Sequence, residues 1–328
     1  MHSIMIEVTD LTKEFNGKKA VDNISFSVKQ GETFVLLGTS GCGKTTTLKM
    51  INRLIEPTSG NIQVEGKNVL EQEPTDLRKG IGYVIQNIGL FPHYTVGQNI
   101  AVVPHLLKWK KQDIQERTHE LMEMVGLSPP EFQDRYPQEL SGGQQQRIGL
   151  ARAFAADPPI ILLDEPFGAL DPITRREIQQ EFKRLETILE KTLILVTHDV
   201  FEAFELGDRI CLMDKGIVQQ VGTPKELIFS PEKEFVTQFF QTNRFLLELK
   251  VFQLQDVLQE MQDIEFQGEP DLSFEESANL LEVVEAMEKT SAPQSPFGIR
   301  GKDKKTAKIA TTKDLLSAFY KAKSKMFS

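Results

Sequence analysis

Residues 38–46 decide the fold of this chain, and they read Gly38-Thr39-Ser40-Gly41-Cys42-Gly43-Lys44-Thr45-Thr46. The apolar run 33–37 precedes them, and a helix-like pattern follows with Leu48, Ile51 and Leu54 on one face. A strand, a glycine-rich turn and a helix, with the spacing G-x-x-x-x-G-K-T, together predict a phosphate-binding P-loop. A glycine-rich loop that merely turns the chain is the alternative.

The chemistry of this loop suits a nucleoside triphosphate. Its glycines allow successive backbone N–H groups to turn inward and surround phosphate oxygens. The N-terminus of the following helix adds partial positive charge at the same place. Lys44 is expected to reach the β- and γ-phosphates, and the Thr45 hydroxyl to bind Mg²⁺. We therefore expect residues 38–46 to bind a nucleoside triphosphate.

Length and composition predict two domains and no membrane-spanning segment. The 328 residues suffice for two hydrophobic cores. A content of 40% hydrophobic and 26% charged residues is ordinary for a globular protein. No run approaches the roughly 18–20 apolar residues that cross a bilayer. The first residues, Met-His-Ser-Ile-Met-Ile-Glu, lack the basic and apolar regions of a signal peptide.

Cysteine usage and net charge bear on the cellular compartment of the chain and on its partners. The two cysteines are Cys42 and Cys211, and Cys42 lies inside the phosphate loop, which argues against a structural disulfide. We therefore expect the chain to lie in a reducing cytoplasm. The net charge of −9 argues against a nucleic-acid groove as the main function, so no nucleic-acid partner is expected.

Two side chains near predicted strands could serve a nucleotide. Residues 1–37 read as β-structure, and Phe15 stands in a polar turn region among them. Its ring can stack on an adenine face, or it is an ordinary core phenylalanine. Gln86 ends the apolar strand 81–86, and its amide suits contact with Mg²⁺ or the attacking water because it both donates and accepts. An ordinary strand-end glutamine is the alternative.

From about Phe91 to Leu150 the pattern turns helical, and within this region lies a second glycine-rich sequence. Ser141-Gly142-Gly143-Gln144 precedes the helix-like run 148–154, so it forms a second backbone anion site with a hydroxyl donor. One nucleotide does not need two phosphate sites in one fold. Two chains that face each other would use both, because each would offer Ser141 to the other's γ-phosphate.

Two carboxylates follow a buried strand. Asp164 and Glu165 end the run that begins at Ile160, where Asp164 can hold Mg²⁺ and Glu165 can polarise the hydrolytic water. Two solvated carboxylates at a strand end are the alternative. Shortly after them, Asp171 is expected to cap a helix whose first residue is Pro172.

A histidine follows the next strand. His198 comes directly after the strand 193–196, at the edge where parallel α/β sheets bind ligands, so it can contact the γ-phosphate. A structural histidine is the alternative. Residues 209–221 then read as a hairpin that turns at Asp214-Lys215-Gly216.

These motifs together resemble the nucleotide-binding subunits of ABC transporters over roughly residues 4–240. The resemblance rests on residues 38–46, Gln86, Ser141-Gly142-Gly143-Gln144, Asp164-Glu165, Ala169-Leu170-Asp171 and His198. It implies an α/β P-loop ATPase core with an antiparallel β subdomain and a helical subdomain at about residues 90–155. It also implies ATP, Mg²⁺ and a head-to-tail homodimer that closes two ATPs between Lys44 of one chain and Ser141 of the other.

The resemblance also implies roles for single residues. Phe15 matches the aromatic residue that stacks on adenine, usually a tyrosine, so the stacking is kept and a hydroxyl is lost. Gln86 matches the glutamine that joins the Mg²⁺ site, and Asp171 matches an aspartate of the nucleotide site. Glu165 matches the catalytic carboxylate, and His198 matches the switch histidine.

Within this family, residues 84–96 resemble the importers of quaternary amines, although similar Phe-Pro-His sequences occur in importers of other small solutes. Phe91, Pro92 and Tyr94 would offer an apolar patch beside Gln86 to a cytoplasmic helix of a membrane subunit, and plain core packing is the alternative. The implied partners are permease subunits with a substrate-binding protein or domain, at the cytoplasmic face of the membrane. Glycine betaine, choline, carnitine and ergothioneine fit equally, because the ATPase does not touch the solute.

The remaining residues, 241–328, are expected to form a second domain, small and of the α+β class. Residues 251–288 are rich in Asp and Glu without Lys or Arg, and the sign reverses from Arg300 onwards. The segment 308–319 resembles the end of a CBS module, of which one divergent copy fits here. Because such modules work in pairs, we expect pairing across two subunits. Nucleotide binding, a response to ionic strength by screening of these charges, and plain dimerisation all stay open.

We therefore predict the ATP-hydrolysing subunit of a small-solute importer, in which Glu165 acts on the attacking water. An importer ATPase for a different solute is one alternative, and a soluble ABC ATPase of nucleic-acid metabolism is another. The long coiled-coil insertions of repair types and the two cassettes of translation types do not occur in this sequence. Exporters usually fuse a membrane domain to the cassette, and a regulatory subunit would lack the carboxylate that Glu165 supplies.

Overall fold

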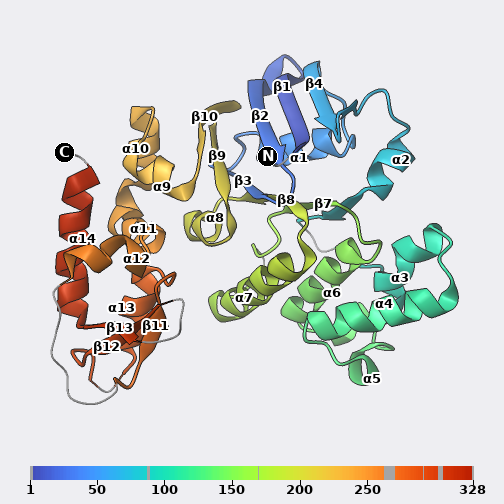
Figure 1. Ribbon diagram of the computed structural model, residues 1–328. Helices are drawn as coiled ribbons and strands as arrows, with labels where there is room; N and C mark the ends of the chain where they lie inside the picture. The colour runs from blue at the N-terminus through green and yellow to red at the C-terminus, as the bar shows by residue number, and fades with distance from the viewer. Residues whose placement is uncertain are drawn as a thin grey trace. The chain divides into compact units, whose positions relative to one another are not determined.

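The computed structural model describes residues 3–86, 89–168, 170–261, 270–290, 292–301 and 306–326. Its contacts divide the chain into two compact units, Met1–Thr223 and Pro224–Ser328. Figure 1 shows the elements of both. The sequence placed the domain boundary at residue 240, which is the last residue of helix α10 (Glu234–Phe240) in the second unit.

The first unit begins with an antiparallel sheet in the strand order β2-β1-β4-β5 (Figure 1). Its strands are β1 (Ile4–Phe15), β2 (Lys18–Lys29), β4 (Ser59–Val64) and β5 (Lys67–Asn68). Ile24, Phe26 and Val28 of β2 alternate with more exposed neighbours and point into the core, as a half-buried strand requires. The β-structure predicted for residues 1–37 is confirmed from Ile4 onwards by β1, β2 and the strand β3 (Thr33–Gly38).

The second sheet has the order β10-β9-β3-β8-β7-β6. Its strands are β3 (Thr33–Gly38), β6 (Ile81–Val84), β7 (Ile160–Asp164), β8 (Thr192–Thr197), β9 (Arg209–Asp214) and β10 (Ile217–Gly222). All neighbours pair in parallel except β9 and β10, which form the predicted hairpin. Every residue of β3, β7 and β8 is buried, as in parallel sheets that are covered on both faces. The carboxyl ends of β3, β8, β7 and β6 therefore meet at one edge.

Helices complete the first unit (Figure 1). They are α1 (Lys44–Ile51), α2 (Pro74–Lys79), α3 (Val96–Leu106), α4 (Lys111–Met124), α5 (Pro129–Phe132), the 3-10 turn η1 (Pro137–Glu139), α6 (Gly142–Phe154), α7 (Pro172–Leu189) and α8 (Val200–Leu206). α3 packs against α4 and α6, which confirms the helical region predicted from about Phe91 to Leu150. Gly126, with a φ of 69°, follows the end of α4, where a glycine in the left-handed region suits a helix C-terminus.

The helix after the phosphate loop is shorter than the sequence predicted. Leu48 and Ile51 are buried in the core as expected, but α1 ends at Ile51 and Leu54 is 44% exposed. The reason lies in Arg53, whose φ of 47° is left-handed and cannot continue an α-helix. The expectation that Leu54 continues the apolar face was therefore wrong.

The second unit is an α+β arrangement with its own core. Its elements are α9 (Pro224–Phe229), α10, η2 (Gln241–Asn243), α11 (Arg244–Val251), α12 (Leu254–Val257), η3 (Leu258–Glu260), β11 (Ser273–Glu275), α13 (Leu280–Glu288), β12 (Phe297–Arg300), β13 (Thr306–Ala310) and α14 (Thr312–Met326). The three strands form one sheet in the order β11-β12-β13. Phe252, Phe297 and Phe319 are fully buried in the core. The α+β class agrees with the expectation, and the likeness to a CBS module stays a prediction.

The helices and the two cysteines can also be compared with the expectations for membrane spans and disulfides. Within the ranges given above, no helix is both long and apolar enough to cross a membrane. Cys42 and Cys211 are both free thiols and both buried.

Candidate nucleotide-binding site

The phosphate loop joins β3 to α1 and needs glycine where it touches neighbouring backbone. A Cβ at Gly38 would lie 2.1 Å from the carbonyl oxygen of Met213, and one at Gly43 would lie 2.5 Å from that of Ala20. Gly43 also takes a φ of 104°, which side-chain-bearing residues rarely adopt. The loop is therefore pressed against β2 and β9, and its shape is set by the fold around it.

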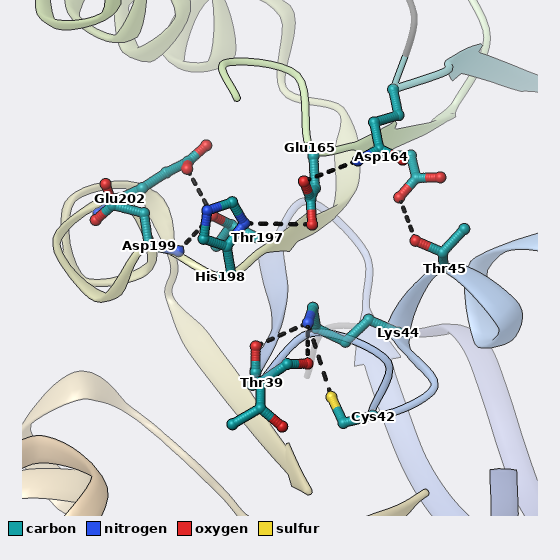
Figure 2. A network of polar contacts seen from close by, with 12 residues as sticks. Thr39, Cys42, Lys44, Thr45, Asp164, Glu165, Thr197, His198, Asp199 and Glu202 are labelled. Carbon is teal, nitrogen blue, oxygen red and sulfur yellow. Dashed lines mark hydrogen bonds and ion pairs between the residues drawn. The ribbon is translucent and has the colours of Figure 1, made fainter. Parts of the chain in front are cut away.

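Lys44 is buried inside the loop that it ends (Figure 2). Its Nζ donates to the carbonyl oxygens of Gly38 at 2.7 Å and Thr39 at 2.9 Å, and it lies 3.7 Å from Cys42 Sγ. The ammonium group thus stands at the N-terminus of α1, where helix backbone N–H groups also favour an anion. Burial raises the pKa of the Cys42 thiol, so the loop cysteine stays neutral beside this charge.

Thr45 and Asp164 supply oxygen atoms next to each other (Figure 2). Thr45 Oγ1 donates to Asp164 Oδ1 at 2.7 Å, which connects the first turn of α1 to the end of β7. Burial raises the pKa of Asp164, and the hydrogen bond from Thr45 opposes this shift. Hydroxyl and carboxylate oxygens are the protein ligands that Mg²⁺ prefers when phosphates complete its coordination. Within the described ranges, no group of three or more His, Cys, Asp or Glu side chains could hold a metal ion. One hydroxyl and one carboxylate fit a Mg²⁺ ion whose other ligands are phosphate oxygens and water.

The Glu165 carboxylate lies between two polar side chains. Gln86 Nε2 donates to its Oε2 at 3.0 Å, and His198 Nδ1 lies 3.3 Å from its Oε1. Glu165 itself takes a φ of 47°, an uncommon backbone conformation for a glutamate, and its N–H donates to the carbonyl oxygen of Val196 at 3.0 Å. The strands β6, β7 and β8 thus deliver Gln86, Glu165 and His198 to one point, as the parallel order predicts.

The loop that carries His198 is fixed by a short chain of hydrogen bonds (Figure 2). Thr197 Oγ1 accepts from the Asp199 N–H at 3.0 Å and donates to Glu202 Oε2 at 2.6 Å. Asp199 caps α8 through the N–H groups of Phe201 and Glu202. The imidazole of His198 remains largely exposed at the edge of the sheet, so it is free to meet a ligand there.

Phe15 ends β1 with its ring in solvent. The residue is 46% exposed, so the core-packing alternative does not hold. Lys13 Nζ lies 5.0 Å from the ring centroid, a cation–π distance. A flat, exposed ring is available for stacking, and its contact with adenine stays a prediction.

The second glycine-rich sequence caps α6. Ser141 Oγ accepts from the Gln144 N–H, and the Gln144 side chain accepts from the Ser141 N–H, which is a capping box. A Cβ at Gly143 would lie 2.7 Å from Thr174 Cγ2, so α6 lies close to the start of α7. These hydrogen bonds of Ser141 stay within its own helix start and do not reach the phosphate loop.

Asp171 caps α7 as predicted, and its pKa is lowered by hydrogen bonds, the strongest from Thr174. Ala169, the residue two before it in the shared motif, lies outside the described residues. Nucleotide contact at Asp171 stays a prediction.

The predicted docking patch is exposed and borders a pocket. Phe91, Pro92 and Tyr94 are all exposed, so plain core packing does not describe them. A pocket of about 310 Å³ is lined by residues of α2, β6, α3 and α6 and of the loops beside them, and its lining includes Tyr83, Phe91 and Arg152. Arg152 donates to the carbonyl oxygen of Gly89 at 2.8 Å, and its guanidinium lies 5.8 Å from the Phe91 ring centroid.

Sequence reasoning missed Glu202 and Arg175. Arg175 Nη2 donates to the carbonyl oxygen of Leu170 at 3.0 Å, and Nη1 lies 3.5 Å from Asp199 Oδ2, so this side chain joins the two loops. In the sequence, Glu202 stands three residues after the capping Asp199 and reads as an ordinary capping-box partner. Its burial and its bond to Thr197 depend on how α8 packs, for which the sequence holds no signal.

The fold and the contacts above define a P-loop nucleotide-binding protein of the ATP-binding-cassette type. The family model described as ABC transporter matches residues 21–168. The chain is 55% identical over 243 residues to the glycine betaine/carnitine/choline transport ATP-binding protein OpuCA of Bacillus subtilis, covering 74% of this chain and 64% of that protein. It is 52% identical over 258 residues to the osmoprotectant import ATP-binding protein OsmV of Salmonella typhimurium, covering 77% and 68%.

A solved structure of an ABC transporter cassette has a similar fold. The dimeric structure of MJ0796, a bacterial ABC transporter cassette, superposes with a TM-score of 0.61 at 34% identity and covers 67% of this chain and 98% of that one. This chain belongs to the family of ABC transporter ATP-binding proteins. The matched region spans about two thirds of the length of the curated relatives, 64% for OpuCA.

Proposed function

We propose that this chain is the ATP-hydrolysing subunit of an ABC importer for a quaternary-amine solute such as glycine betaine, choline or carnitine. One observation carries the hydrolytic activity: the Glu165 carboxylate lies between Gln86 and His198, directly after the Asp164 that binds Thr45 of the phosphate loop. The solute class is supported by the relatives, whose names specify transport of glycine betaine, carnitine, choline or osmoprotectants.

The loop binds the triphosphate in this proposal. Backbone N–H groups of residues 38–46 and the Lys44 ammonium face the phosphate oxygens, and Phe15 stacks on the adenine. Thr45, Gln86 and Asp164 would hold Mg²⁺, which would neutralise negative charge on the phosphates.

Hydrolysis depends on one carboxylate. Glu165 accepts a proton from the water that attacks the γ-phosphorus, and Gln86 and His198 hold its two oxygens in place. Because the carboxylate already has these partners, little rearrangement is needed when the substrate arrives, which is the condition for electrostatic preorganisation.

A second copy of the chain completes the site. Ser141, at the N-terminus of α6, has backbone and hydroxyl donors but makes its hydrogen bonds inside its own capping box. In a head-to-tail homodimer, Ser141-Gly142-Gly143-Gln144 of one copy would contact the γ-phosphate held by Lys44 of the other. The dimeric structure of the MJ0796 cassette supports dimerisation.

The permease subunits dock beside the site in this proposal. Phe91, Pro92 and Tyr94 are exposed and come shortly after Gln86, which follows β6, so movement of a docked helix would reach the residue that holds Glu165. The chain would then lie at the cytoplasmic face of the membrane and work with a substrate-binding protein or domain.

The second unit has a regulatory role in this proposal. We expect a single CBS-like module at 241–328 that pairs with the same unit of a second copy. Comparison of the full chain with a chain that ends at Thr223 tests this: the salt dependence of the ATPase and dimerisation of the unliganded protein should both be lost with the second unit.

An importer of a different small solute is the second candidate. The chain is 43% identical over 259 residues to the sulfate/thiosulfate import ATP-binding protein CysA of Pectobacterium atrosepticum, covering 77% of this chain. Sequence similarity of the ATP-binding subunit therefore does not distinguish an importer of quaternary amines from an importer of another small solute.

The deciding experiment reconstitutes this subunit with its permease in proteoliposomes and titrates a panel of trimethylammonium compounds, with sulfate as the comparison. Stimulation of ATP hydrolysis by a trimethylammonium compound supports the proposal. Stimulation by sulfate alone would favour the second candidate, and a complex that hydrolyses no ATP would contradict both.

A further inference from the structure

A small cavity lies beside His198, outside the contacts described for the nucleotide. It measures about 20 Å³, and its lining includes Glu165, Arg175, His198 and Glu202. This volume holds one water molecule. The cavity therefore lies between Glu165, the carboxylate that acts on the attacking water in the proposed mechanism, and Arg175 and Glu202, which that mechanism does not use.

Two of the lining residues bring polar atoms that lack partners. Glu202 is 5% exposed, and its Oε1 has no hydrogen-bond partner among the described residues. Arg175 Nε is also buried and without a partner in that part of the chain. An unsatisfied buried polar atom is costly, and two residues that each carry one line the same water-sized cavity, which indicates a built site.

The hydrogen bonds around Glu202 locate a proton. Thr197 Oγ1 accepts from the Asp199 N–H, so the hydroxyl proton of Thr197 is directed to Glu202 Oε2 at 2.6 Å. Oε2 is therefore an acceptor. If the carboxyl group is protonated, its proton lies on Oε1, the oxygen that has no protein partner.

Burial, more than the surrounding charges, favours the protonated form. The pKa of Glu202 is raised to about 8, chiefly by burial and further by the nearby carboxylates of Asp199 and Glu165. The hydrogen bond from Thr197 and the charge of Arg175 oppose it. Arg175 is committed elsewhere, since it pairs with Asp199 and donates to the carbonyl oxygen of Leu170. His198 lines the same cavity, with its Nδ1 directed to Glu165.

We propose that Glu202 is a positioning residue that works as a neutral acid: with a water molecule shared with Arg175, it holds the His198 loop against Glu165. This inference rests on the proposed ATPase function. Loss of the Oε1 proton would add a third negative charge to those of Glu165 and Asp199 and draw Arg175 away from Asp199. The loop would then shift, and ATP hydrolysis would fall at alkaline pH.

The first test is the pH profile of kcat for ATP hydrolysis by the reconstituted complex. We expect the wild type to lose activity on the alkaline side with a midpoint near pH 8. E202Q keeps a donor and an acceptor but cannot ionise, so its activity should persist to higher pH. E202A should lower kcat about tenfold or more at every pH, since it removes the partner of Thr197. E205Q, on the same helix, is the matched control and should follow the wild type.

An alkaline midpoint that is the same in E202Q and the wild type would overturn the inference while leaving the ATPase proposal intact. A second readout needs no activity: infrared difference spectroscopy of the full chain should show the C=O stretch of a protonated carboxylic acid at pH 7. This band should be present in the wild type and in E205Q and absent in E202Q. A band that persists in E202Q would also overturn the inference, even if the complex had no ATPase activity.

Discussion

Thr45 Oγ1 donates a 2.7 Å hydrogen bond to Asp164 Oδ1, which joins the first turn of α1 to the carboxyl end of β7. The two residues are far apart in sequence, yet both were expected to serve Mg²⁺. The fold itself pairs their oxygens, so a Mg²⁺ ion bound by both residues would find its two ligands side by side.

Removal of the Thr45 hydroxyl should raise the Mg²⁺ requirement. In Thr45→Ala, Asp164 loses its donor and the ion loses a ligand, so half-maximal ATP hydrolysis should need at least tenfold more Mg²⁺. Thr45→Ser restores the hydroxyl and should behave nearly as the wild type. The measurement is a Mg²⁺ titration of ATPase activity at saturating ATP. If Thr45→Ala needed no more Mg²⁺ than the wild type for half-maximal ATP hydrolysis, Thr45 would not be a ligand of the metal ion.

Replacement of the Glu165 carboxylate should stop hydrolysis without preventing binding. Glu165→Gln keeps a polar side chain between Gln86 and His198 but cannot accept a proton, so the rate should fall by about 10²- to 10⁴-fold. ATP-bound dimers should accumulate and be visible by size-exclusion chromatography with ATP and Mg²⁺. Glu71→Gln, at an exposed position, is the control. Normal turnover in Glu165→Gln would contradict the assignment.

The Phe15 ring should contribute to nucleotide affinity by its shape alone. Phe15→Ala should weaken ATP binding about 2- to 10-fold, which corresponds to about 0.5–1.5 kcal/mol for an aromatic contact. Phe15→Tyr should bind as tightly as the wild type. Equilibrium binding of a fluorescent ATP analogue measures both. Equal affinities in Phe15→Ala and the wild type would leave the exposed ring without a role at this site.

Much of the site could be predicted from the sequence, because its parts follow parallel strands. Once β3, β6, β7 and β8 are recognised, the parallel order brings the residues after them to one edge. Gln86, Asp164, Glu165 and His198 were all expected there, and the structure places them in contact with one another or with Thr45.

The parts that could not be predicted depend on packing between distant segments. The apolar spacing of Leu48, Ile51 and Leu54 suits a longer helix, but the left-handed backbone at Arg53 ends it. Glu202 reads as a helix-cap residue, and its burial arises only when α8 packs onto the sheet. Periodicity reports which face of an element is apolar and does not report which polar atoms are left inside.

The exposed patch of Phe91, Pro92 and Tyr94 should affect assembly with the permease and should not affect nucleotide binding. Phe91→Ser removes apolar surface at the rim of the 310 Å³ pocket, so co-purification of the permease and stimulation by solute should both decrease. ATP binding by the isolated subunit should be unchanged. Leu106→Ser is the control, because Leu106 is 74% exposed on α3 and does not line that pocket. Equal losses in both variants would argue against docking at Phe91.

The raised pKa of Glu202 also predicts how stability depends on pH. Its pKa is about 8 in the folded chain and 4.5 ordinarily, so between these values the folded state binds more protons than the unfolded state. The free energy of unfolding of the wild type should therefore fall as pH rises from about 4.5 to about 8. Glu202→Gln lacks this loss, so its Tm relative to the wild type should increase across that window and level off above it. Glu205→Gln should show no such trend. Thermal unfolding of the nucleotide-free chain at pH 5, 6, 7, 8 and 9 measures the difference, and a Tm difference that stays constant over this range would show that Glu202 titrates normally.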